Sequence, residues 1–169
     1  YMPFDDLNAE VTSDITWWPW REWYYTINVC NFAISRCGED NSQLSNKMKR
    51  IKGQVLFLRG LSYYNLVGYY QNPPLITDYA TYSSLDGLYT TNSTYDNVLD
   101  QVEKDFHEAM ELLPSRDEGG EWAGGRATCG AAAGYYARAL MMRQKYSDAL
   151  TVLKDIIGKK YGTYRLMSN

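Results

Sequence analysis

Residues 57–76 read FLRGLSYYNLVGYYQNPPLI, a long apolar run that stops at two prolines. Across residues 55–70 the plainly polar side chains recur every three positions, as Arg59, Ser62 and Asn65. On a helix they form one narrow stripe, and the rest of the circumference is apolar. A helix of this kind is typical of the interior of a helical stack. A membrane span would need about 20 uninterrupted apolar residues, and Arg59 interrupts this run.

Two arginines are predicted to have structural roles. Arg59 lies within the predicted buried helix, and a desolvated guanidinium needs a carboxylate or carbonyl oxygens as partners. We therefore predict that Arg59 is paired inside the stack. Arg126, in the stretch GGRAT, precedes another predicted helix and is expected to brace a loop in the same way.

Four further helices are predicted around this stretch. The first begins at Pro19, which suits the first helical turn, and the third is capped by Ser93 or Thr94. Residues 71–93 are predicted as a long loop, and such a loop inside a compact domain is typical of a functional or disordered segment. No segment alternates convincingly as a strand. The five predicted helices cover about 19–36, 44–70, 94–113, 128–143 and 147–157.

Composition excludes several classes of protein. The chain of 169 residues is long enough for one domain with a core, and its hydrophobic fraction of 45% argues against disorder. Its net charge is −3 and it has no basic stretch, so no nucleic-acid partner is expected. Sixteen Tyr and five Trp stand against four Phe. Rings with a polar group are typical of half-wet surfaces and binding sites, although a Tyr-rich core explains them equally well.

The cysteines and the histidine do not suggest chemistry. Cys30 and Cys37 lie seven residues apart on a predicted helix, so their Cα atoms are roughly 10 Å apart, beyond the reach of a disulfide. Together with Cys129 they are predicted to be buried thiols. His107, the sole histidine, falls on the polar side of a predicted helix. We identify no metal site, no cofactor and no acid–base pair, so the chain is not expected to be an enzyme.

The last two predicted helices form a recognisable unit. Small residues crowd the first of them, with Ala137 at its centre, and Tyr146, Ala149, Leu153 and Ile156 follow on the second. This small-and-large pattern resembles a tetratricopeptide repeat (TPR). The helices predicted over 44–70 and 94–113 resemble a second pair. The predicted fold class is therefore all-α, a stack of TPR-like helix pairs.

Four sequence blocks are more specific than the repeats. The first is Trp20, Tyr24, Ile27 and Asn31, and the others are FLRGLSYYNLVGYYQNPPLIT, TYDNVLDQVEKDFHEAMELLP and GRATCGAAAGYYARALMMRQKYSDA. In this order they resemble the SusD/RagB family of nutrient-binding outer-membrane lipoproteins of Bacteroidetes. Departures are small; Gly60, for example, stands where the family usually has Ala.

The resemblance implies a location and partners. Family members are several hundred residues long, so residues 1–169 are expected to be a single SusD-like TPR-containing region from the N-terminal portion of a longer chain. A signal peptide and a lipidated cysteine upstream would anchor the protein at the cell surface in the outer membrane. The implied function is to bind an oligosaccharide or other nutrient and to deliver it to a SusC-type TonB-dependent transporter.

The candidate ligand contacts are mostly aromatic. Rings stack on the apolar face of a sugar, and a carboxylate beside them binds hydroxyl groups. We predict that these contacts include Asp14, together with aromatic residues that fall outside the predicted helices: Trp17, Trp18, Tyr79, Tyr82 and Trp122. Tyr89 also falls outside the predicted helices, which favours a glycan-binding surface.

Two alternatives stay open. At the chain's entry to the first predicted helix, the two tryptophans could instead form a hydrophobic staple, in which the residue before the cap packs on the first turn. The alternative function is a TPR-type adaptor for a protein partner, which would present polar and charged side chains on a concave face.

Missing downstream helices would also leave apolar surface exposed. Tyr135, Met141 and Met142 leave the main stripe of their predicted helix, so we expect them to be exposed. We expect the isolated region to be less stable than the longer protein, or to associate.

Overall fold

The computed structural model describes residues 14–165 except 39, 83, 85 and 123. Five long helices make up most of the described chain, and no strand occurs in it. They are α1 (Asp14–Cys37), α2 (Asn46–Tyr70), α4 (Tyr95–Leu112), α5 (Cys129–Met142) and α6 (Tyr146–Ile157). The short helices are η1 (Asn41–Gln43), α3 (Tyr79–Tyr82), η2 (Asp86–Tyr89), η3 (Arg116–Glu118) and η4 (Gly120–Trp122).

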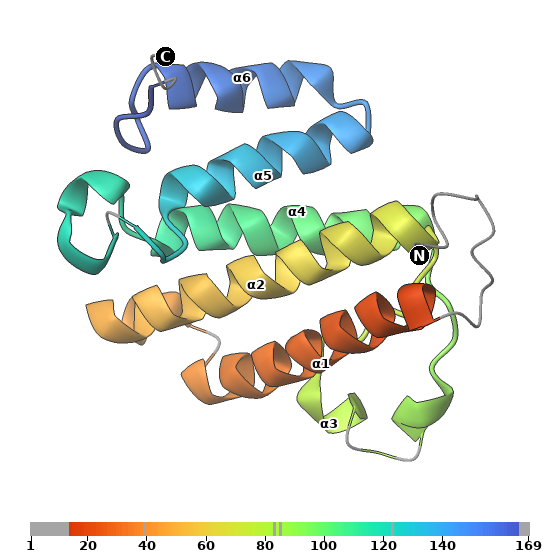
Figure 1. The fold of residues 1–169 in the computed structure, drawn as a ribbon. Coiled ribbons are helices and arrows are strands. Elements are labelled where there is room, and N and C mark those ends of the chain that lie inside the picture. The colour runs from red at the N-terminus through yellow and green to blue at the C-terminus, as the bar shows by residue number, and fades with distance from the viewer. Residues whose placement is uncertain (1–13, 39, 83, 85, 123, 166–169) are drawn as a thin grey trace.

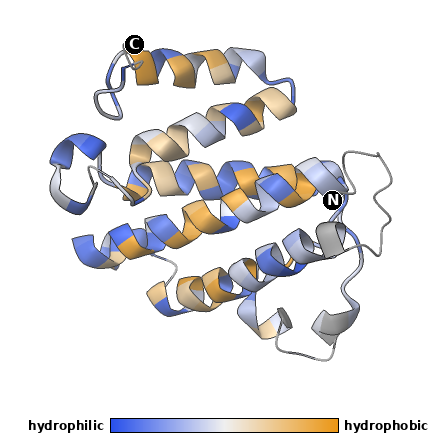
Figure 2. Cartoon of the chain, in the orientation of Figure 1, coloured by the Kyte–Doolittle hydropathy of each residue, from blue (hydrophilic) through white to orange (hydrophobic). Residues whose placement is uncertain are grey.

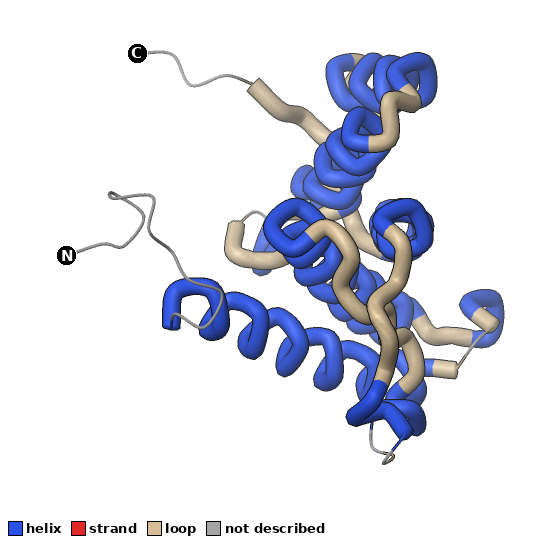
Figure 3. Tube along the Cα trace, turned by 90° about the vertical axis from the view of Figure 1, so that its right-hand side faces the viewer, coloured by secondary structure: helices blue, strands red, loops and turns tan. Residues whose placement is uncertain are grey.

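The long helices form a stack in chain order. Each long helix packs on the next, and successive helices run in opposite directions (Figure 1). In the view turned by 90°, α1 runs at an angle to the other helices (Figure 3). The predicted all-α stack of helix pairs is confirmed. Within the described residues, no helix combines the length and hydropathy that a membrane span requires.

Hydroxyl side chains set three of the helix starts. Ser45, Thr94 and Thr128 are the N-caps of α2, α4 and α5, and each side-chain oxygen accepts a hydrogen bond from a backbone N–H in the first turn. Such a cap satisfies one of the N–H groups that a helix start leaves without a partner. These starts lie within two residues of the predicted ones, because the cap signal is local.

Helix α2 is the centre of the core, as its sequence predicts. It lies between α1 and α4, and its buried apolar side chains are Leu56, Phe57, Tyr63, Leu66 and Val67. Gly60 permits the close approach of α4, because a Cβ added there would lie 3.1 Å from a ring atom of Phe106. Helices on both sides therefore cover most of the apolar circumference of residues 57–70, whereas Leu58 and Tyr69 stay exposed.

The predicted pairing of Arg59 is confirmed. Its Nε and Nη2 atoms donate to the two carboxylate oxygens of Asp105 on α4, at 2.8 and 2.7 Å. Both side chains are almost fully buried. The polar stripe of α2 thus faces a carboxylate within the stack. All three cysteines are free and buried, also as predicted.

The start of the first helix was predicted wrongly. α1 begins at Asp14, five residues before Pro19, and runs through the proline. Pro19 is the sixth residue of the helix, so the missing N–H costs only one backbone hydrogen bond, to the carbonyl of Ile15. A proline is typical of the first turn of a helix, but a helix can also begin one turn before it.

The predicted exposure of three apolar residues is only partly right. Met141 is exposed, whereas Met142 and Tyr135 are partly buried against the core. The Tyr135 ring packs on the rings of Phe57 and Phe106, with centroids 5.6 and 5.5 Å away. Helix α5 has neighbours on two sides, so residues outside its main stripe are covered as well.

The exposed apolar face lies on α6 instead. The inner side of α6 buries Ala149 and Val152 against α5, and apolar residues recur along the rest of the helix (Figure 2). Four of them are exposed at spacings of four, three and four residues, a single face: Tyr146, Leu150, Leu153 and Ile157. Tyr146 and Leu153 belong to the repeat-like pattern, and they are exposed because α6 packs on a described helix on one side only.

Candidate functional site

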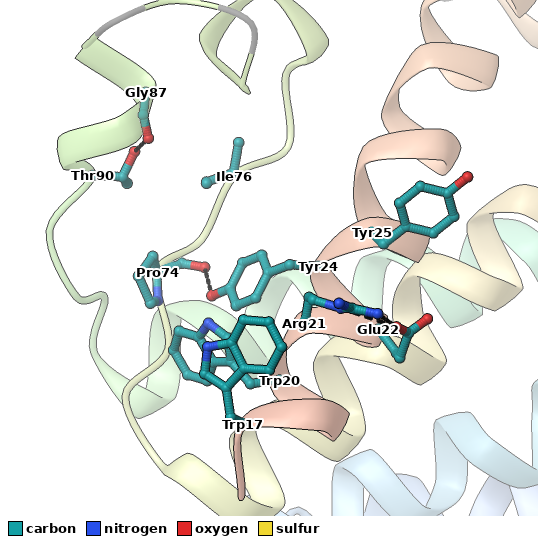
Figure 4. A pocket seen from close by; sticks show the side chains of 10 residues that line it. All are labelled: Trp17, Trp20, Arg21, Glu22, Tyr24, Tyr25, Pro74, Ile76, Gly87 and Thr90. Carbon is teal, nitrogen blue, oxygen red and sulfur yellow. Dashed lines mark hydrogen bonds and ion pairs between the residues drawn. The ribbon is translucent and has the colours of Figure 1, made fainter. Parts of the chain in front are cut away.

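A pocket of about 660 Å³ lies beside the first turns of α1. It separates α1 from two parts of the 71–94 connection, the extended chain after Pro73 and the turn around Gly87 (Figure 4). The pocket is open to solvent, and its lining is mainly aromatic. The lining residues are Trp17, Trp20, Arg21, Glu22, Tyr24, Tyr25, Pro74, Ile76, Gly87 and Thr90.

The aromatic wall is built by one face of α1. Trp17, Trp20 and Tyr24 follow a three-then-four spacing, which places them on the same side of the helix. The rings of Trp20 and Tyr24 lie 4.9 Å apart, and Trp20 also meets Tyr70 of α2 edge-on at 4.9 Å. The hydroxyl of Tyr24 donates to the carbonyl oxygen of Pro74 at 2.6 Å (Figure 4). These contacts fix the wall, while Trp17 at its outer end stays 50% exposed.

The mouth of the pocket carries one cation and one anion in contact. The guanidinium carbon of Arg21 lies 5.1 Å from the ring centroid of Trp17 and 4.2 Å from that of Trp18. Residues three and four positions apart are neighbours on a helix surface, which explains this arrangement. Arg21 also donates to Glu22, with Nη2 2.8 Å from Oε1. Both side chains are about half exposed, so their remaining hydrogen-bonding capacity faces solvent.

The opposite wall is a turn held by local hydrogen bonds. Asp78 accepts from the backbone N–H of Thr81 at 3.0 Å, and this bond is the main reason why the pKa of the Asp78 carboxyl lies below its usual value. Thr90 donates to the carbonyl of Gly87 at 2.7 Å. A Cβ at Gly87 would lie 1.8 Å from the carbonyl oxygen of Thr81, so the turn requires glycine.

Among the predicted ligand residues whose side chains the structure describes, Trp17 lies in the pocket. Trp17 lines it, and Trp18 lies next to Trp17 with their ring centroids 6.5 Å apart, but does not line it. Tyr79 packs edge-on against Phe32, at 5.1 Å, further along α1. Asp14 is the first residue of α1, and its side chain falls outside the described part of the structure.

Three other aromatic residues from outside the predicted helices lie in short helices of the connections. Tyr89 ends η2 and is 84% exposed, without lining the pocket. Tyr82 lies in α3 and Trp122 in η4, and neither side chain is among those described. Residues 120–122 lie at the end of the stack where α2 begins, whereas the pocket lies where α1 begins (Figure 1).

The expectation that these aromatic residues lie outside helices is wrong. Trp17 and Trp18 belong to α1, and the others belong to short helices in the connections. Because α1 starts at Asp14, neither tryptophan is a residue preceding a cap, so the staple alternative does not apply. The first helix was predicted to begin at Pro19, so its aromatic face was taken to begin at Trp20. The same helical spacing, continued towards the N-terminus, reaches Trp17.

Several lining residues were missed as ligand contacts. Tyr25, which is 64% exposed, lies off the buried stripe of α1, and that position is the signal that could have identified it. Trp20 and Tyr24 were noted as part of a family block and not as ligand contacts; Tyr24 belongs to the core and Trp20 packs against it. Thr90 and Gly87 carry no such local signal, because their place at the pocket depends on how the connection folds back.

The arrangement suits stacking and hydrogen bonding. It offers flat ring surfaces, a guanidinium, a carboxylate and the Thr90 hydroxyl around an open cavity. Among the residues that the structure describes, no three His, Cys, Asp or Glu side chains gather as a metal-binding group.

Comparison with known proteins assigns the family. A family model described as SusD-like, starch-binding and associating with the outer membrane matches residues 3–141. The chain belongs to the SusD-like family. No curated protein matches it in sequence.

Solved SusD-like structures share the fold. A SusD-like carbohydrate-binding protein from Bacteroides fragilis NCTC 9343 superposes with a TM-score of 0.79 at 24% identity, over 89% of this chain and 29% of its own. A second SusD-like protein from the same organism gives 0.73 at 26% identity, over 88% and 27%. A laminarin-binding SusD-like protein gives 0.71 at 25% identity, over 88% and 32%. The present chain thus spans about a third of the length of these relatives.

Proposed function

We propose that this SusD-like chain binds a glycan in the pocket beside α1. The observation that carries the proposal is the row of rings at Trp17, Trp20 and Tyr24, beside the ion pair of Arg21 and Glu22. A sugar ring has an apolar C–H face and a rim of hydroxyl groups. The rings match the face, and the charged pair and the Thr90 hydroxyl match the rim.

The exposed rings set the expected affinity. A half-exposed ring such as Trp17 can stack on one sugar and contribute roughly 1–2 kcal/mol, by analogy with aromatic pairs. A few such contacts support a dissociation constant on the order of 10 μM to 1 mM. That range suits the capture of a polymer with many repeated units.

The comparisons support the ligand class and the location. The family model's description names starch binding and the outer membrane, and one relative of the same fold is named for laminarin. We propose that the full protein is a lipid-anchored, surface-exposed binding protein of the outer membrane rather than an enzyme. We further propose that it passes its ligand to a SusC-type TonB-dependent transporter.

The test of glycan binding is calorimetric titration with maltoheptaose and laminarihexaose, probes for starch and laminarin. Trp17→Ala should raise the dissociation constant by roughly fivefold to thirtyfold, the equivalent of one lost stacking contact. Trp18→Ala is the matched control, because Trp18 is equally exposed on the same helix but lies outside the pocket. Equal effects of the two substitutions, or tight binding unaffected by either, would refute this site.

The transporter proposal needs its own experiment. The full protein should co-purify from outer membranes with a transporter of the SusC type. Recovery of a different protein partner, with neither oligosaccharide bound, would favour the adaptor function instead.

A further inference from the structure

One wall of the pocket is an extended segment that belongs to no helix. Residues 73–77 run along the side of α1 and α2, and Pro74 and Ile76 line the cavity (Figure 4). Pro73 and Ile76 are buried. Buried backbone N–H and C=O groups need partners, and here most of the partners are side chains.

Tyr63 of α2 supplies two of those hydrogen bonds. Its hydroxyl accepts from the backbone N–H of Ile76 at 2.7 Å and donates to the carbonyl oxygen of the same residue at 2.9 Å. The Tyr63 side chain is fully buried. Burial raises the pKa of its phenol above the usual value, so the donor proton is retained.

The core ion pair reaches the same segment. Asn31 of α1 donates through Nδ2 to the carbonyl oxygen of Ile76 at 2.8 Å, and its Oδ1 accepts from Arg59 at 2.9 Å. The same Nη1 of Arg59 also donates to the carbonyl oxygen of Thr77 at 3.3 Å. Asp105 fixes the other edge of the guanidinium. The ion pair is thus coupled to two carbonyl groups of the wall.

Ser93 completes the attachment from the far end of the connection. Its hydroxyl accepts from the backbone N–H of Leu75 at 3.1 Å, and its own N–H donates to the carbonyl of Pro73 at 3.4 Å. Of these contacts, only the last joins two backbone groups. The segment is therefore positioned by a small set of side chains from α1, α2 and Ser93.

We infer that Tyr63, with Asn31 and Arg59, is a positioning residue for the ligand pocket. It acts through the backbone of Ile76, and no ligand contact of its own is needed. These buried groups hold one wall of the pocket at a fixed distance from the rings of Trp20 and Tyr24. The inference rests on the proposed function, because it takes this pocket to be the glycan site.

The test compares two destabilising substitutions in the full chain. Tyr63→Phe removes only the hydroxyl and leaves the ring in the core. Val152→Ala weakens the contact between α5 and α6, far from the pocket wall. Hydrogen exchange of the Ile76 amide is measured in both, beside urea unfolding. We expect Tyr63→Phe to accelerate that exchange by about tenfold or more beyond Val152→Ala at matched global stability, because a local hydrogen bond is lost.

A second pair of variants guards against a purely global effect. Ser93→Ala removes another hydroxyl that holds the segment, and it should accelerate exchange at Leu75. Ser62→Ala is its control, because the buried hydroxyl of Ser62 bonds only to the carbonyl of Leu58 in its own helix. Exchange of the Ile76 amide that is no faster in Tyr63→Phe than in Val152→Ala would overturn the inference.

Ligand binding separates this inference from the proposed function. With the oligosaccharide that the wild type binds more tightly, Tyr63→Phe should raise the dissociation constant by about tenfold, because the two buried hydrogen bonds of the hydroxyl to Ile76 are lost. Val152→Ala should leave it unchanged. An unaltered dissociation constant beside faster local exchange would overturn the link to binding. If the wild type binds neither oligosaccharide, the glycan function fails, and the exchange experiment alone decides whether Tyr63 positions the segment.

Discussion

At the scale of single residues, the decisive feature is a charge inside an apolar helix. Arg59 and Asp105 are both nearly fully buried and share a two-pronged hydrogen bond. Removing one partner leaves the other desolvated without compensation, and that loss is far larger than the net contribution of an exposed pair.

We therefore predict that Asp105→Ala lowers the free energy of unfolding by about 3–5 kcal/mol, the usual cost of leaving a buried charge unpaired. Asp100→Ala on the same helix should cost less than about 1 kcal/mol, because Asp100 pairs with Arg143 at an exposed site. Urea denaturation measures both. Similar losses in the two variants would show that burial does not govern the Arg59 pair.

At the scale of elements, two glycines of α5 should respond differently when each is replaced by alanine. A Cβ at Gly130 would lie 2.2 Å from the hydroxyl oxygen of Tyr164, whereas Gly134 has no atom within 4 Å of its added Cβ. Gly134→Ala should stabilise the protein by roughly 0.5–1 kcal/mol, the helix-propensity difference. Gly130→Ala should stabilise less or destabilise, because Tyr164 must leave its contact with Thr128. Thermal unfolding compares them, and equal gains would argue against the docked position of Tyr164.

The turn at α3 should respond to acid. The pKa of Asp78 is lowered below 3.8, chiefly by the backbone N–H of Thr81. A depressed carboxyl pKa means that the folded turn favours the charged form. Its contribution to stability is thus complete above the unfolded value and is lost as pH falls through the folded value. After correction for the intrinsic pH dependence of amide exchange, the protection of the Thr81 amide should fall below about pH 4. Asp78→Asn should flatten this pH dependence. A wild-type profile that is already flat would contradict the prediction.

At the scale of the whole molecule, the stack ends on an exposed apolar face. The face on α6 carries Leu150 and Ile157, which are 52% and 81% exposed, and contiguous faces of this kind promote association. We predict concentration-dependent association of the chain by sedimentation velocity. Leu150→Lys combined with Ile157→Lys should abolish it. Thr151→Lys, which adds charge on an exposed polar position of the same helix, should not. A strictly monomeric wild type would contradict the prediction.

The helical architecture follows from local patterns of residues. The narrow polar stripe of residues 55–70 predicted an interior helix from the period of the helix alone. The pairing of Arg59 followed from the cost of burying a charge without a partner. The resemblance to the SusD-like family also followed from four short sequence blocks and their order along the chain, and the family model confirms it. Caps at Thr94 and Thr128 gave helix starts close to the observed ones, since an N-cap interacts only with its own first turn.

Which aromatic residues form the pocket depends on contacts between segments that are far apart in the sequence. Tyr24 meets Pro74 across fifty positions of sequence, and Ile76 is held by side chains from two helices. Whether a ring is buried, stacked or open to a ligand depends on such distant neighbours, and periodicity contains no information about them. Trp17 and Trp18 are adjacent and equally exposed, yet only Trp17 faces the cavity. The 100° turn between successive helical residues, together with the fold of the 71–94 connection, makes that difference.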